Sequence, residues 1–149
     1  LELGTGNGLC ANFLLDNYDC YVDTVDIEDL RVVEENNEKY EVSSISNLQP
    51  YIDSGRCTFH EMNTKDFLYS NTDKVYDFIY IDASHDKDWV LFDAVNAFNL
   101  LRPDGLLIFD DYGWGECRVG IDSFLKCFDS KITIFHKEWQ VMIHKLSNL

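Results

Sequence analysis

Short apolar runs alternate with helical patterns along the whole chain of 149 residues. This alternation is typical of a parallel β-sheet whose strands are joined by crossover helices. We expect strands at residues 1–3, 21–26, 57–61, 75–82, 105–109, 131–136 and 139–145. We expect helices at residues 9–17, 30–48, 64–69, 87–101 and 117–128. Because no linker or repeat interrupts this pattern, the sequence predicts a single α/β domain over residues 1–149.

Two of the expected strands contain near-continuous apolar runs, at residues 75–81 and 106–109. Such runs are typical of strands in the middle of a sheet that are covered on both faces. The last two strands are separated only by Lys137 and Glu138, so they should form a tight hairpin with an antiparallel strand. We therefore expect a doubly wound, mostly parallel sheet of seven strands with an antiparallel terminal hairpin. Since the chain opens inside an expected strand and without Met, we also expect that the amino-terminal part is missing.

The charge of the chain restricts its partners. Twelve Lys and Arg residues stand against 27 Asp and Glu residues, which gives a formal net charge of −15. Such a charge repels nucleic acid and anionic membrane surfaces, so we expect a small-molecule partner, with a homo-oligomer left open. Five cysteines without C-x-x-C spacing indicate reduced thiols and a cytoplasmic protein. No apolar run approaches the roughly 18 residues of a membrane span.

Three glycines, Gly4, Gly6 and Gly8, lie between the first expected strand and the first expected helix. Glycine permits positive φ angles and lets a ligand approach the backbone closely. Asp26 ends the second expected strand, where a carboxylate can accept hydrogen bonds from a ribose diol. The two features together predict a nucleotide-like cofactor. An NAD fingerprint needs glycine where Leu9 stands, so a dehydrogenase is a less favoured alternative; a plain tight turn with Asp26 as a helix cap is another.

Acidic residues follow both central strands, with Asp82 after the first and Asp110 and Asp111 after the second. Ligands bind beyond the carboxyl ends of strands in such sheets, and adjacent strands lie about 4.8 Å apart. We therefore expect these carboxylates to converge and to repel one another unless a cation lies between them. Mg²⁺ or Mn²⁺ fits such an oxygen site. The alternative is a set of solvated strand-end acids or helix caps.

His85 lies three residues beyond Asp82, where a loop gives way to the next expected helix. A histidine at this place can exchange protons at neutral pH and act as a general base. It can also contact a bound ion from outside its ligand set, or serve only as a structural cap. Tyr112 and Trp114 follow the acid pair, and they either form a wall of the acceptor site or pack on their own domain.

Residues 2–8, Glu-Leu-Gly-Thr-Gly-Asn-Gly, resemble the first motif of class I S-adenosylmethionine (SAM) dependent methyltransferases, E/D-x-G-x-G-x-G. The acid at Asp26 and the terminal hairpin also fit that family. The resemblance implies a Rossmann-like fold, a methionine site at the glycines and a ribose site at Asp26, with Asn63 beside adenine. The cofactor-binding residues implied in this way are Glu2, Gly4, Gly6, Gly8, Asp26, Asn63 and Asp82.

A closer resemblance is to macrocin O-methyltransferase-like sugar methyltransferases, which share a D-D-Y-G segment, then C-R, then an I/V-D-x-F helix. Here these are residues 110–113, 117–118 and 121–124, although the usual proline before Cys117 is absent. By this resemblance Asp82, Asp110 and Asp111 are metal ligands and His85 is the general base. The implied activity is transfer of a methyl group from SAM to a hydroxyl of a small molecule or sugar, assisted by Mg²⁺ or Mn²⁺. The alternatives are a metal-independent methyltransferase and an inactive binding module of the same fold.

Overall fold

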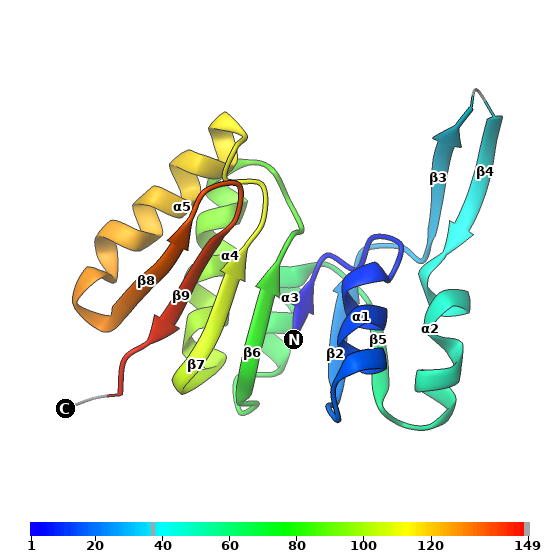
Figure 1. Ribbon diagram of the computed structural model, residues 1–149, viewed down its shortest axis with the longest axis horizontal. Coiled ribbons are helices and arrows are strands. Elements are labelled where there is room, and N and C mark those ends of the chain that lie inside the picture. The colour runs from blue at the N-terminus through cyan, green and yellow to red at the C-terminus, as the bar shows by residue number, and fades with distance from the viewer. Residues whose placement is uncertain (37, 148–149) are drawn as a thin grey trace. The chain divides into compact units, whose positions relative to one another are not determined.

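The computed structural model describes residues 1–36 and 38–147, and its sheet confirms the expected Rossmann-like architecture (Figure 1). The sheet order is β5 (Cys57–Glu61), β2 (Val22–Asp26), β1 (Glu2–Leu3), β6 (Tyr76–Ile81), β7 (Leu101–Phe109), β9 (Val141–Lys145) and β8 (Ile132–Lys137). Strand β9 is antiparallel to both β7 and β8, while the pairs β1–β2, β2–β5 and β6–β7 are parallel.

The chain divides into two compact units. The first unit comprises residues 2–67, and the second comprises Leu1 with residues 68–149. Helix α3 (Thr64–Ser70) contains the point where the first unit ends.

The first unit contains helices α1 (Leu9–Asn17) and α2 (Ser44–Asp53) together with strands β1, β2 and β5. Apolar side chains of both helices form a core with the beginnings of β2 and β5. Its fully buried members are Ala11, Leu15, Val22, Leu48 and Cys57. The glycine turn before α1 is attached to the carboxyl end of β2, because the Gly4 amide donates to the Val25 carbonyl at 2.8 Å.

The prediction of a helix at residues 30–48 is wrong. The structure has an antiparallel hairpin of β3 (Leu30–Glu35) and β4 (Glu38–Ser43), and α2 begins only at Ser44. Val32, Tyr40 and other β-formers fill these strands. Asn36 has a φ of 54° in the two-residue connection, which suits a tight hairpin turn; Asn37, also within the expected helix, lies outside the described residues.

Asp29 closes the base of the β3–β4 hairpin. Its Oδ1 accepts a hydrogen bond from the Ile45 amide at 2.7 Å, and its Oδ2 accepts one from the Ser43 hydroxyl at 2.8 Å. Partial burial opposes ionisation of Asp29, but the hydrogen bonds from Ile45, Ser43 and Ser44 outweigh it and lower the pKa of the carboxyl. The first turn of α2 is thus attached to the end of the loop that follows Asp26.

In the second unit, helices α4 (Lys87–Leu100) and α5 (Gly115–Cys127) pack side by side against one face of the sheet (Figure 1). Phe109 and Ile79 are fully buried on this face, and the ring of Phe124 packs against Phe109 at a centroid distance of 5.3 Å. Side chains of β6 that point the other way, such as Phe78 and Tyr80, are only half-buried. In the part of the chain that the structure describes, the prediction that the central strands are covered on both faces is therefore confirmed for one face only.

Strand β7 begins at Leu101, four residues earlier than expected. The residues Pro103, Asp104 and Gly105 lie within it and coincide with a shift in its register against β6, and Asp104 has a φ of 60°. A proline-glycine segment at a strand irregularity is a common arrangement. A short 3₁₀ helix, Asp129–Lys131, leads into β8.

None of the helices in the described residues combines the length and the apolar character that crossing a membrane requires.

Candidate functional site

The glycine turn of the first unit has the backbone that the sequence predicted. Gly4, Gly6 and Gly8 have φ angles of 91°, 55° and 76°, all in the left-handed region that favours glycine. A Cβ atom on Gly6 would meet no atom within 4 Å, whereas one on Gly8 would lie 3.2 Å from Leu48 Cγ. The turn is therefore open at Gly6, where a ligand can approach the main chain, and closed against the core at Gly8.

Asp26 is brought to this turn, as predicted. Its Oδ2 accepts a hydrogen bond from the Gly6 amide at 3.0 Å, and its Oδ1 accepts one from the Ile27 amide at 2.8 Å. The residue is 6% exposed. Each carboxylate oxygen can accept more than one hydrogen bond, so a carboxylate fixed by main-chain amides in this way can also accept from hydroxyl groups of a ligand.

Two other predicted cofactor residues have structural partners in the first unit. Glu2 is buried and accepts a hydrogen bond from the Thr24 hydroxyl, which in turn contacts the Thr5 hydroxyl at 2.6 Å. Asn63 caps α3, because its Oδ1 accepts from the Asp66 amide at 2.8 Å. Glu2 thus stabilises the glycine turn through Thr24 and Thr5. The cofactor contacts of Glu2 and Asn63 remain predictions.

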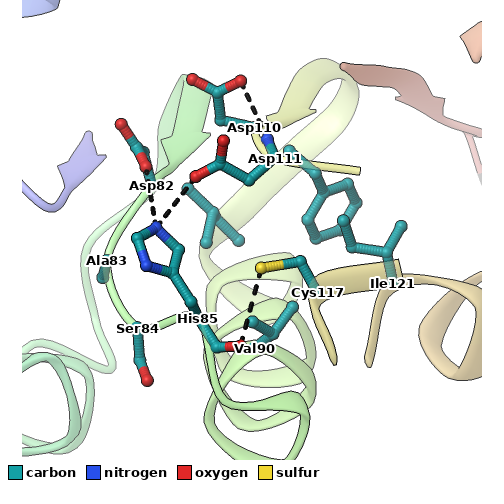
Figure 2. Close-up of a pocket in the computed structure, with 11 residues that line it drawn as sticks. Asp82, Ala83, Ser84, His85, Val90, Asp110, Asp111, Cys117 and Ile121 are labelled. Carbon is teal, nitrogen blue, oxygen red and sulfur yellow. Dashed lines mark hydrogen bonds and ion pairs between the residues drawn. The ribbon is translucent and has the colours of Figure 1, made fainter. Parts of the chain in front are cut away.

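The second unit brings Asp82, His85 and Asp111 together beyond the ends of β6 and β7 (Figure 2). The Nε2 atom of His85 lies 2.9 Å from Asp111 Oδ2 and 3.9 Å from Asp82 Oδ1. One potential ligand atom from each of the three residues lies within 4.8 Å of the others. Asp82 and Asp111 together form the acid cluster. Beneath it the pocket has an apolar lining, which includes Ile81, Val90, Phe109 and Ile121.

Asp110, the third predicted metal ligand, lies at the edge of the acid cluster and accepts three hydrogen bonds of its own. Its Oδ2 accepts a hydrogen bond from the Tyr80 hydroxyl at 2.5 Å, and its Oδ1 accepts from Gln140 Nε2 at 3.3 Å and from the Asp111 amide at 2.9 Å. Its carboxylate is directed away from the His85 ring (Figure 2). Tyr80 and Gln140 were not predicted from the sequence. The hydroxyl group of a tyrosine two residues before Asp82 was the available signal.

The electrostatics show that the acids are crowded. Partial burial and the negative charges of Asp110 and Asp111 together raise the pKa of Asp82 to about 6. Like charges on neighbouring strand ends therefore repel one another here, as expected from the sequence. A divalent cation bound between the carboxylates would remove this repulsion.

The loop after β7 positions Asp111 and Trp114 next to His85. Asp111 has a φ of 56°, which few side chains adopt readily. The Tyr112 hydroxyl donates to Asp122 Oδ1 at 3.0 Å, which fastens the loop to α5. Trp114, about half exposed, packs its ring against His85 at a centroid distance of 4.5 Å. His85 thus packs against the loop that carries Asp111, with the exposed indole of Trp114 beside it.

The comparison with known families decides the general identity of the chain. The sequence profile of a family described as "Methyltransferase domain" matches residues 1–112. The chain belongs to this methyltransferase-domain family. No curated protein matches the chain.

Solved structures with the same fold as this methyltransferase domain include two O-methyltransferases and the methyltransferase MycE. NovP is 17% identical, with 98% of this chain and 71% of that chain covered and a TM-score of 0.73. The O-methyltransferase from Bacillus cereus, solved in complex with SAH, is 19% identical, with coverages of 98% and 72% and a TM-score of 0.69. MycE of the mycinamycin biosynthetic pathway, in complex with Mg and SAH, is 17% identical, with coverages of 97% and 44% and a TM-score of 0.68.

Proposed function

We propose that this methyltransferase domain transfers a methyl group from SAM to a hydroxyl group of a small molecule or sugar, with the assistance of a divalent metal ion. The observation that carries the proposal is the acid cluster with His85 beyond β6 and β7. The family match supports methyl transfer in general. The acid cluster adds the groups that an oxygen acceptor needs, because a hydroxyl must lose its proton to become a good nucleophile.

The first unit has the residues to hold the cofactor. SAM supplies a methyl group on a positively charged sulfur, which leaves S-adenosylhomocysteine (SAH) after transfer. Gly6 would admit the cofactor to the main chain, and Asp26 would accept hydrogen bonds from the ribose hydroxyls. SAH complexes of the Bacillus cereus enzyme and of MycE support the same cofactor here.

The second unit has a donor set that suits a hard or borderline divalent cation. Asp82 and Asp111 offer carboxylate oxygens, and Asp110 lies at the edge of the same acid cluster. Mg²⁺ and Mn²⁺ prefer such oxygen ligands, and MycE was solved with Mg. When bound, the ion would lower the pKa of a coordinated hydroxyl and fix its orientation.

His85 would accept the hydroxyl proton. Its Nε2 atom faces the two carboxylates and lies 2.9 Å from Asp111 Oδ2 (Figure 2), so this nitrogen would take the proton of a hydroxyl held between them. The Asp111 carboxylate would then stabilise the protonated ring. A second role is favoured by the same cluster: Nε2 could instead bind the ion directly.

A net charge of −15 favours an acceptor other than nucleic acid.

The decisive experiment measures SAM affinity by calorimetry and methyl transfer to a panel of hydroxyl compounds, with chelator and then with added Mg²⁺ or Mn²⁺. We expect metal-dependent transfer that Asp110→Asn abolishes, while SAM affinity stays within a few fold. Full activity in chelator would make the enzyme metal-independent, and SAM binding without any transfer would make it a binding module.

A further inference from the structure

Asp110 receives hydrogen bonds from two side chains that lie far from it in the sequence. The Tyr80 hydroxyl donates from β6, and Gln140 donates from the residue just before β9. Gln140 Nε2 also lies 3.3 Å from the Tyr80 hydroxyl, so the three side chains form one closed network. A carboxylate offers about four acceptor positions, and together with the Asp111 amide this network occupies three of them.

The network acts against a force that the acid cluster itself creates. Asp110 carries the same charge as Asp82 and Asp111, so repulsion favours rotation of its side chain out toward solvent. Two donors from distant segments, Tyr80 on β6 and Gln140 in the turn before β9, keep the Asp110 carboxylate at the edge of the acid cluster instead. A neutral hydroxyl and a neutral amide suit this task, because neither brings a positive charge that would compete with a cation.

Gln140 is itself held by the turn between β8 and β9. The Glu138 amide donates to the Gln140 carbonyl at 3.0 Å, and the Tyr112 amide donates to the Trp139 carbonyl at 2.9 Å. The Trp139 ring covers Gly113 so closely that a Cβ there would lie 2.2 Å from a ring atom. The hairpin turn and the acid loop are therefore packed together, and Gln140 has little freedom to move.

We propose that Tyr80 and Gln140 are positioning residues, which hold the Asp110 carboxylate in one orientation and thereby raise the affinity of the acid cluster for a divalent cation. This inference rests on the proposed function, since it assumes the cation. Hydrogen-bond partners that orient metal-binding side chains typically change metal affinity 10- to 100-fold when removed.

The test uses Mn²⁺, whose binding to the protein is measured by electron paramagnetic resonance and calorimetry without acceptor. We expect Tyr80→Phe and Gln140→Met each to weaken Mn²⁺ binding about 10-fold or more. SAM affinity and the melting temperature should stay close to those of the parent protein. Tyr40→Phe is the matched control, because it removes another tyrosine hydroxyl that donates to a carboxylate, that of Glu35 in the first unit.

A second measurement separates positioning from a general structural effect. In an Asp110→Ala background, Tyr80→Phe should change Mn²⁺ affinity less than twofold, because its effect passes through Asp110. The inference is overturned if Tyr80→Phe leaves Mn²⁺ affinity unchanged in the parent background, or if it weakens Mn²⁺ binding equally in both backgrounds. In either case, SAM binding and methyl transfer by the parent protein would still support the proposed function. A parent protein that binds no Mn²⁺ overturns the inference together with the proposed metal assistance, and SAM affinity in the same sample then still tests the methyltransferase function.

Discussion

The Nε2 atom of His85 lies 2.9 Å from Asp111 Oδ2, which joins the proposed proton acceptor to one of the proposed metal ligands. This relationship makes the two roles of His85 separable by experiment. A base is needed only for turnover, whereas a ligand is needed for metal binding as well.

We predict that His85→Gln lowers kcat by a factor of about 10² to 10⁴, because a positioned general base contributes on that order. Mn²⁺ and SAM affinities should stay within a few fold of the parent values. His144→Gln, an exposed histidine on β9, is the control and should keep full turnover. A His85→Gln protein that has lost its Mn²⁺ affinity would identify His85 as a ligand instead.

Asp111→Asn should raise the Mn²⁺ dissociation constant about 10-fold or more and abolish turnover, since a charged oxygen ligand becomes a neutral one. Asn tolerates the left-handed backbone at this position, so the melting temperature should change little. Asp104→Asn is the matched control because Asp104 also has a positive φ, of 60°. Unchanged Mn²⁺ binding by Asp111→Asn would remove Asp111 from the metal site.

Stability of the metal-free protein should depend on pH through Asp82. The pKa of Asp82 is raised to about 6 in the folded chain, from a usual value near 4. Between these two values the folded state binds the proton more tightly than the unfolded state, so the stability from this group is present below about pH 4 and is lost as the pH rises toward 6.

Urea unfolding from pH 4 to pH 7.5 compares the parent protein with Asp82→Asn. Relative to the variant, the parent should lose stability as the pH rises through this window, and added Mn²⁺ should restore it above pH 6. Parallel pH profiles of the two proteins would contradict the raised pKa of Asp82.

Asp26→Ala should weaken SAM binding about 10-fold or more, because it removes hydrogen bonds to the ribose and frees the Gly6 amide that Asp26 fixes. Calorimetry with SAM measures the change, and Asp53→Ala at the end of α2 serves as a control acid of the same unit. Equal SAM affinities for the parent and Asp26→Ala would exclude Asp26 from the cofactor pocket.

Asp29→Ala should lower the free energy of unfolding by about 1 to 2 kcal/mol, since it removes hydrogen bonds to the first turn of α2 and to Ser43. Denaturant unfolding gives this value directly. Asp29→Asn keeps one acceptor oxygen and should lose less stability than Asp29→Ala. A loss of equal size in both variants would show that the charge of Asp29, rather than its hydrogen-bond geometry, stabilises the base of the hairpin.

The mostly parallel sheet and the placement of the acids were predictable from the sequence because both follow from the alternation of strands and helices and from where strands end. An acid directly after a buried strand must lie at its carboxyl end, and Asp82, Asp110 and Asp111 all do so. Asp26 was predictable for the same reason. These inferences need only the period of the apolar pattern and the direction of the strands.

Other features depend on contacts that no local pattern records. The orientation of Asp110 is set by Gln140, 30 residues away, whose own neighbours carry no motif. The error at residues 30–48 has a different cause, because apolar residues in that segment fit a helix and a hairpin almost equally well. The Asn36-Asn37 pair, with β-formers such as Val32 before it and Tyr40 after it, was the available signal for the turn.

The left-handed backbone of Asp111 limits what can replace it. Besides aspartate, only asparagine and glycine occupy such a conformation with ease, and both lack the negative charge. Glutamate keeps the charge but takes on the backbone strain. A single substitution at this position therefore loses either the negative charge or the unstrained backbone. If the cation is needed for activity, almost no replacement of Asp111 would be selectively neutral.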